Sequence, residues 1–171
     1  MQIKEYIQQA FNYTYWANRR YLAVAEGLPQ KQLLQQHGHS WGSVQSVLLH
    51  MLSSETVWLR RWNGDSPSRH LDPNDYPSLA AVKEKWLTVE REMQAFIGRQ
   101  TEDSLAREIS YTNFSGNTYH VPLWQMLMHV PNHETHHRGE LAAMFALMQV
   151  PHPEEEAIQY FLDLSGQKKA Q

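Results

Sequence analysis

The sequence contains no cysteine among its 171 residues. A disulfide framework is therefore excluded, and any metal site must use histidine and carboxylate side chains. No apolar run approaches the ~20 residues that cross a bilayer as a helix. The first residues also lack the basic segment and apolar segment of a secretion signal. We therefore expect a cytoplasmic protein that does not bind membranes.

The sequence also has fewer basic than acidic residues. Lys and Arg together number 15 against 18 Asp and Glu, which gives a formal net charge of −3 at pH 7. The basic residues are scattered, so the electrostatic surface that nucleic acids require is missing. We expect no nucleic-acid partner. The length, by contrast, suits one domain with a sizeable core.

Histidine is the residue that the sequence has in unusual density. Four of the ten histidines, His129, His133, His136 and His137, fall within nine residues. Apolar residues flank them at three- and four-residue steps, which predicts a helix over residues 122–149. At about 100° per residue, His133 and His137 lie one turn apart on one face. Two imidazoles at that spacing can bind one divalent ion.

Three further segments show helical periodicity, with Gly, Pro or Ser at their boundaries. Together with the histidine-rich helix they predict an all-α fold, a four-helix bundle. Such bundles build metal sites from the inward side chains of facing helices. We expect one domain over residues 1–165 and a disordered tail over residues 166–171. The three segments are residues 2–26, 43–62 and 78–98.

The connections between these helices differ in character. Residues 29–42 and 64–77 are rich in polar residues, Gly and Pro, and we predict loops there. Residues 107–121 change to the two-residue period of strands on either side of a Ser-Gly-Asn turn. They predict a short β-hairpin before the fourth helix. Residues 154–164 predict a short C-terminal helix.

A site with His133 and His137 needs a third ligand from another helix. His50 is the only histidine in the core-facing part of another predicted helix, so we favour it. His129 and His137 lie ~12 Å apart along the helix axis. Because Zn–N bonds measure about 2 Å, one ion does not accommodate both of them with His133. His129 is therefore the reserve ligand.

Residues 133–137 also match the His-Glu-x-x-His motif of zinc peptidases, in which the Glu is the general base. The Gly and third His of the extended motif are absent. On an ideal helix Glu134 points about 100° away from His133. It suits a general base only if the substrate cleft opens on that side. A zinc metallopeptidase is therefore the least favoured enzyme class.

Three motifs carry a family resemblance. They are Tyr15-Trp16-Ala17-Asn18-Arg19-Arg20, then Leu49-His50-Met51 with Glu55, Trp58 and Gly64, and finally His129-Val130-Pro131-Asn132-His133-Glu134-Thr135-His136-His137-Arg138-Gly139-Glu140. In combination they resemble the DinB (DinB/YfiT-like) family of metal-dependent enzymes over nearly the whole chain. The resemblance implies a four-helix bundle, commonly dimeric, with a metal triad on His50, His133 and His137. The chain departs from the family pattern at Pro131, where proline is unusual, and at Glu140, where Gln is usual.

The resemblance implies a metal-dependent enzyme whose relatives include thiol-dependent S-transferases and isomerases. We expect a Zn or Ni ion, held by three histidines, that lowers the pKa of a bound water or thiol toward ~7. With no cysteine in the chain, a low-molecular-weight cosubstrate must bring the thiol. A thiol-dependent S-transferase or a hydrolase fits this expectation. The alternative is a non-catalytic structural or stress-response metal protein, which a fourth ligand such as His129 or Glu140 would favour.

The remaining candidates are expected around the ligands. His129, His136, Tyr15 and Glu140 are candidates for contacts to the substrate or to the ligand side chains. Arg138 and Tyr15 are candidates for holding an anionic part of the thiol. Arg138 faces away from the ligands on an ideal helix, however, so we favour a place at the surface or at a dimer contact. The His-x-His pair at residues 37–39 lies in a Gln-rich loop, and we expect it at the surface.

Overall fold

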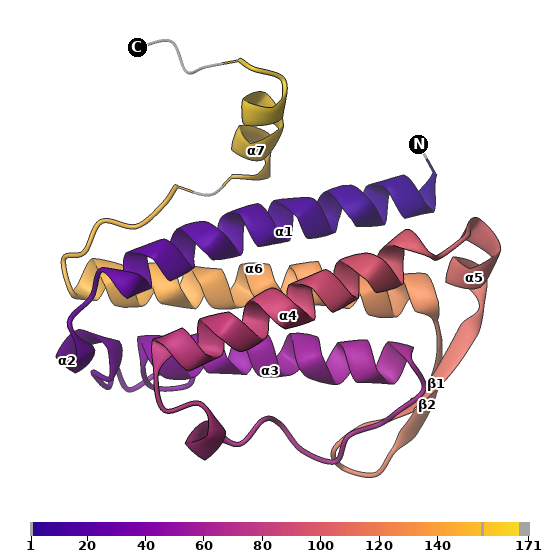
Figure 1. Ribbon diagram of the computed structural model, residues 1–171, viewed down its shortest axis with the longest axis horizontal. Helices are drawn as coiled ribbons and strands as arrows, with labels where there is room; N and C mark the ends of the chain where they lie inside the picture. Colours follow the sequence, from indigo (N-terminus) through magenta and orange to yellow (C-terminus); the bar gives the residue numbers. More distant parts are fainter. Residues whose placement is uncertain (1, 155, 168–171) are drawn as a thin grey trace.

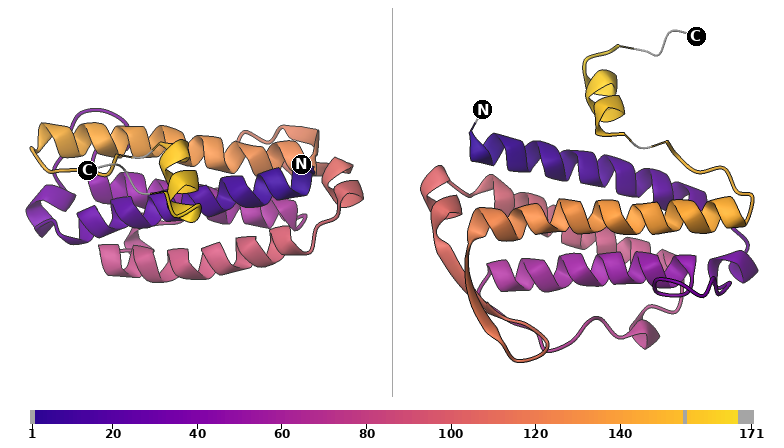
Figure 2. Two further views of the ribbon diagram at one scale, coloured as in Figure 1. Left: turned by 90° about the horizontal axis from the view of Figure 1, so that it is seen from above. Right: turned by 180° about the vertical axis from the view of Figure 1, so that it is seen from behind.

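Four long helices form the body of the protein in a computed structural model that describes residues 2–154 and 156–167. Each of the four packs against two others (Figures 1 and 2): α6 lies between α1 and α3, and α4 contacts the same two helices on the other side. The predicted all-α four-helix bundle is confirmed. The helices are α1 (Ile3–Glu26), α3 (Val44–Trp62), α4 (Leu79–Gly98) and α6 (Leu123–Leu147).

Shorter elements connect the long helices. The predicted hairpin is confirmed and pairs antiparallel strands, with Tyr111 opposite Tyr119. The hairpin and the loop after α3 lie on the same side of the bundle (Figure 1), and the Thr112 N–H donates to Ser66 Oγ at 2.9 Å. Neither α2 nor α5 was predicted, because one or two turns are too short for a periodic pattern. The elements are α2 (Gln30–Leu33), η1 (Pro73–Asp75), α5 (Glu102–Ala106), β1 (Glu108–Thr112), β2 (Thr118–Pro122) and α7 (Ala157–Leu164).

The histidine-rich helix α6 begins directly after Pro122 and runs unbroken for 25 residues through Pro131. Proline removes one backbone donor from the helix. The carbonyl oxygen of Pro131 accepts a hydrogen bond from Thr135 Oγ1 at 2.9 Å. The buried residues of α6 face in several directions, because α1, α3, α5 and β2 all contact it. The helix is therefore fixed on several sides where its histidines project.

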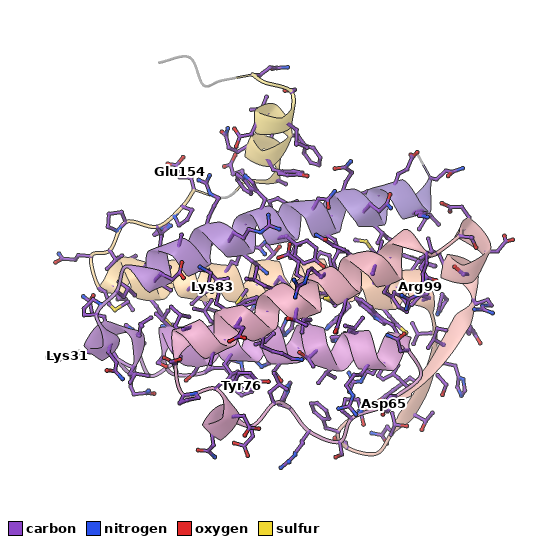
Figure 3. All side chains as sticks on the ribbon, in the orientation of Figure 1. Lys31, Asp65, Tyr76, Lys83, Arg99 and Glu154 are labelled. Carbon is purple, nitrogen blue, oxygen red and sulfur yellow. The ribbon has the colours of Figure 1, made fainter. Side chains whose placement is uncertain are left out.

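Apolar side chains from all four long helices fill the space between them (Figure 3). Phe11 of α1 contacts Trp62 of α3 edge-on, with ring centroids 6.0 Å apart, and Trp62 contacts Phe96 of α4 at 5.4 Å. Tyr21 of α1 stacks on Phe145 of α6 at 6.0 Å. One continuous core therefore joins the four helices.

The C-terminal helix α7 contacts α1 through one buried tyrosine. The Tyr160 ring lies 6.0 Å from Tyr13 and 5.7 Å from Trp16. Gly166 and Gln167, in the segment predicted as a tail, follow the end of α7, and the Gln167 N–H donates to the Leu162 carbonyl at 3.0 Å. Residues 168–171 lie outside the described part. Within the described residues, none of the helices is both long and apolar enough to cross a membrane.

We expect Leu127→Ala to lower the free energy of unfolding by about 2–5 kcal/mol, because Leu127 is fully buried in α6 and its loss leaves a cavity. Leu147→Ala makes the same change on the same helix at a side chain that is 67% exposed, and should cost about 0.5 kcal/mol or less. Urea denaturation of both variants measures the difference. Equal losses would contradict the packing described for α6.

Candidate metal centre

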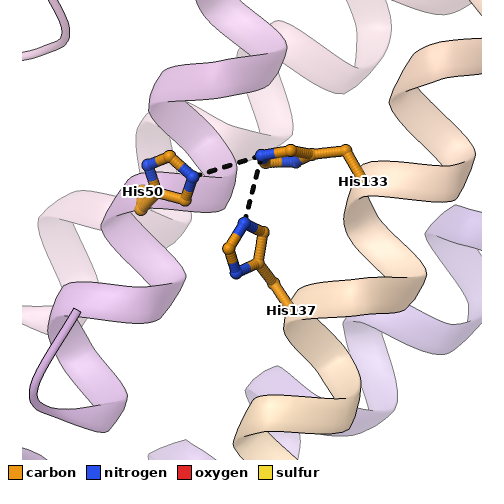
Figure 4. A group of neighbouring side chains, drawn as sticks. All are labelled: His50, His133 and His137. Carbon is orange, nitrogen blue, oxygen red and sulfur yellow. Dashed lines mark hydrogen bonds between the residues drawn. The ribbon is translucent and has the colours of Figure 1, made fainter. Parts of the chain in front are cut away.

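Three imidazoles from two facing helices converge on one point (Figure 4). The Nε2 atom of His133 on α6 lies 3.1 Å from Nε2 of His50 on α3. It also lies 3.1 Å from Nε2 of His137, one turn further along α6. All three nitrogens lie within 4.8 Å of one another. The structure thus brings together the three side chains that the sequence favoured, and the group could hold a metal ion.

A carboxylate behind His137 determines which of its nitrogens carries the proton. His137 Nδ1 lies 2.6 Å from Glu140 Oε2. Burial raises the pKa of Glu140, but hydrogen bonds from Ser40 and His137 outweigh it and lower that pKa overall. An ionised carboxylate can only accept, so Nδ1 of His137 donates and its Nε2 carries a lone pair. A second carboxylate oxygen, Glu134 Oε1, lies 3.4 Å from His133 Nδ1.

The donor set fits a divalent metal. Nε2 of His137 presents a lone pair, and it lies 3.1 Å from Nε2 of His133. Zn–N bonds of about 2.0–2.1 Å place two nitrogens of one ion about 3 Å apart. Burial, followed by the neighbouring His137 and His133, lowers the pKa of His50 to about 3. His50 is therefore neutral at pH 7, as a ligand must be.

The side of the site next to His50 opens into a small apolar pocket. The Trp41 ring stacks on His50 at 4.0 Å between centroids, and the His70 ring approaches His50 at 5.2 Å. The pocket between them has a volume of ≈ 170 Å³, with Leu49 and Leu71 among its walls. Of the three converging histidines, His50 is the one that lines this pocket.

The opposite side of the site is a closed polar network between α1 and α6. Glu134 is fully buried, and its Oε2 accepts a hydrogen bond from Asn18 Nδ2 at 3.0 Å. Arg138 is also fully buried, donates to Asn18 Oδ1 at 2.9 Å and to Thr135 Oγ1 at 2.8 Å. The prediction that Arg138 lies at the surface was therefore wrong. Its direction away from the ligands points it at α1, which covers that face of α6.

A second buried carboxylate extends this network. Trp86 of α4 donates from Nε1 to Glu55 Oε2 at 2.9 Å, and Asn18 Nδ2 lies 3.4 Å from Glu55 Oε1. Burial and then the charge of Glu134 raise the pKa of Glu55 well above its ordinary value. Tyr15 lies beside these carboxylates. Burial, followed by Glu55, Glu90 and Glu134, raises the pKa of its hydroxyl.

The other predicted residues occupy distinct places. His129 is exposed, with its ring 4.7 Å from that of Trp58 and 5.8 Å from that of His133. The side chain of His136 is 67% exposed, with Nε2 3.4 Å from Glu140 Oε1. Glu140 contacts His137, one of the two roles expected of it, whereas Tyr15 is buried and its hydroxyl has no partner among the described residues. The histidines at residues 37–39 belong to neither three-residue group around α6.

Sequence reasoning missed Trp41 and His70. Both belong to segments predicted as loops, where no periodicity indicates the direction of a side chain. His70 Nδ1 lies 2.8 Å from Ser53 Oγ, which also accepts from the Leu71 N–H at 2.9 Å, so the loop is fastened to α3 there. The only signal in the sequence was the presence of an aromatic residue and a histidine in otherwise polar loops.

Comparison with known proteins agrees with this architecture. Protein DinB of Bacillus subtilis is 22% identical over 149 residues, which cover 83% of this chain and 86% of that protein. The crystal structure of a DinB-like protein from Bacillus cereus superposes with a TM-score of 0.66 at 20% identity, and covers 89% of this chain and 97% of that one. A DinB-like protein from Bacillus subtilis gives a TM-score of 0.61 at 18% identity, over 85% and 96% of the two chains. The model of the DinB family matches residues 1–160, and the chain belongs to this family.

Proposed function

We propose that this protein is a metal-dependent enzyme in which His50, His133 and His137 hold a divalent ion, Zn or Ni. The observation that carries the proposal is the convergence of three Nε2 atoms, with His133 3.1 Å from both His50 and His137. A group of three imidazoles suits either ion. The low pKa of His50, at about 3, keeps that ligand available at neutral pH.

The surroundings favour an enzyme over a closed structural site. Oε2 of Glu140 is engaged with His137 Nδ1 and Ser40 Oγ, so it supports a ligand and does not act as one. His129 lies outside the group of converging nitrogens in the described chain. Catalytic zinc sites typically have three protein ligands and keep one position for water or substrate. The apolar pocket beside His50 supports such a role, because it offers space for a small molecule next to one of the three ligands.

Thiol-dependent S-transfer or hydrolysis is the reaction class that we propose. A bound divalent ion supplies Lewis acidity, which lowers the pKa of a thiol or water toward ~7. The chain has no cysteine, so the thiol comes with a low-molecular-weight cosubstrate. Burial lowers the pKa of both His70 and His129, so these imidazoles are neutral at pH 7 and can accept the proton that such a nucleophile releases.

A non-catalytic metal protein is the second candidate, because the ion would link α3 to α6 and could fasten one helix to the other. A zinc metallopeptidase is less consistent with the geometry. Its general base would be Glu134, which is fully buried against Asn18 of α1, away from the pocket beside His50. We also propose a cytoplasmic homodimer, in keeping with the absence of cysteine and with the family resemblance.

His50→Ala, His133→Ala and His137→Ala should each remove most of the bound metal, because each deletes one of three nitrogens. Elemental analysis of the purified proteins measures this. His37→Ala and His152→Ala remove histidines away from the site and should keep wild-type metal content. Full occupancy in His50→Ala would refute the ligand set and favour His129 as the third ligand.

The enzymatic proposal is tested with a panel of small thiols and electrophiles, with and without a chelator. Product should form with the wild type, and both the chelator and His133→Ala should abolish it. Glu134→Gln should retain most of the activity, since the buried carboxylate is not needed as a base. Peptide hydrolysis by the wild type that disappears in Glu134→Gln would instead establish the peptidase.

The metal-free protein should lose stability as pH falls from about 6.5 towards 3. In this window unfolded His50 takes up a proton at its ordinary pKa, whereas folded His50, with its pKa near 3, does not. The unfolded state therefore gains the protons and is favoured. Urea denaturation at pH 7, 6 and 5 should show a shallower decline for His50→Ala than for wild type. Parallel declines would show that His50 titrates normally in the fold.

A further inference from the structure

Arg61 of α3 is a buried cation without an acidic partner. Its residue is 6% exposed, and it forms no ion pair or hydrogen bond through its side chain among the described residues. The Nε atom is fully buried and unpartnered. Buried arginines are normally paired, because an unpaired charge in a low-dielectric site is costly. The neighbouring Arg60 shows the contrast, since it is exposed and donates from Nε to Asp65 at 2.7 Å.

Aromatic rings, not carboxylates, surround the guanidinium. Its central carbon lies 4.8 Å from the ring centroid of Trp58, 4.9 Å from that of Tyr111 and 5.2 Å from that of Phe114. Ring faces attract a cation, but they do not satisfy the planar N–H groups of the guanidinium fork. Burial lowers the pKa of Arg61, yet an arginine remains charged at neutral pH. The fork is therefore free to bind an oxyanion.

A line of ring contacts joins this guanidinium to His50. The His70 ring lies 5.2 Å from His50 and 4.7 Å from Phe114. Phe114, at the hairpin turn, in turn lies under the guanidinium. The loop after α3 and the hairpin thus form one wall between the three-histidine group and Arg61.

A second line joins the guanidinium to His133. The His129 ring lies 5.8 Å from His133 and 4.7 Å from Trp58, and Trp58 contacts Arg61. Along α3, Arg61 follows His50 by 11 residues, about 16 Å, and helical side chains lean back toward the N-terminus. The charged fork and His50 therefore lie on the same face of α3, about three turns apart.

We infer that Arg61 is an oxyanion subsite that binds a carboxylate or phosphate group of the small molecule whose reacting group enters the three-histidine centre. The link to that centre rests on the proposed function, whereas anion binding by Arg61 requires no metal. A bidentate pair with a guanidinium matches the geometry of both oxyanions. The subsite would select anionic substrates or cosubstrates over neutral ones of the same shape.

The test is calorimetric titration of metal-free protein with succinate and, separately, with inorganic phosphate at constant ionic strength. Arg61→Met keeps the length of the side chain without its charge, and should weaken binding of the preferred anion by at least about tenfold. Arg61→Lys keeps the charge without the fork, and its affinity for the anion should lie between those of wild type and Arg61→Met. Arg60→Met is the matched control and should bind as wild type does. The anion that binds more tightly identifies the carboxylate or phosphate class.

Wild-type affinity in Arg61→Met, or anion binding that appears only after metal is added, would overturn the subsite. If the Arg61 variants fail to fold, a measurement on the wild-type protein still tests the inference. The Arg61 Nε–H resonance in a ¹⁵N spectrum should shift on addition of the anion, and an unmoved resonance would also overturn the inference. His133→Ala should retain anion binding. If the metal proposal fails while binding still depends on Arg61, the subsite stands by itself.

Discussion

The convergence of three imidazole nitrogens is the constraint on which the site depends. Three Nε2 atoms from α3 and α6 meet at hydrogen-bond distance, while the ionised carboxylate of Glu140 requires Nδ1 of His137 to be the donor. The surrounding bundle holds these nitrogens together. It does so through the packing of α3 on α6 and through Glu140, which fixes the ring of His137. Such carboxylate partners typically orient metal-binding histidines and raise their basicity.

Acidic, neutral and basic side chains occupy different sides of the site. Buried acids, Glu55 and Glu134, lie on the closed side and share Asn18 with Arg138, which partly compensates them. The three histidines occupy the middle. Toward the loop after α3 and the hairpin, Arg61 is buried among aromatic rings with no acid paired to it in the described chain. In the proposed site, this order keeps the buried carboxylates away from Arg61, so that an anion would meet a cation without their competition.

How far the sequence predicts this arrangement depends on the element. Periodicity gave the four helices, and the spacing of His133 and His137 placed both on one face, because helix geometry is local. His50 followed from needing a ligand on a facing helix. The direction of Arg138 was also correct, but a helical wheel does not say which neighbour covers a face, so its burial against α1 could not be derived. His70 and Trp41 sit in loops whose path is set by tertiary contacts such as Ser53 with His70. Likewise, the aromatic rings around Arg61 include those of hairpin residues, which lie far from Arg61 in the sequence.

The size of the apolar core helps to distinguish a structural from a catalytic role for the proposed ion. Small metal domains fold only with their ion, because their apolar core is insufficient. Here a continuous core already joins all four helices, with fully buried side chains such as Leu52 of α3 and Leu127 of α6. An ion between α3 and α6 would therefore fasten helices that already pack. The three-histidine group, by contrast, brings imidazole nitrogens to hydrogen-bond distance, has the pKa of His50 lowered to about 3 by burial, and has an unpaired cation nearby. A strongly shifted pKa beside a pocket is typical of a functional site.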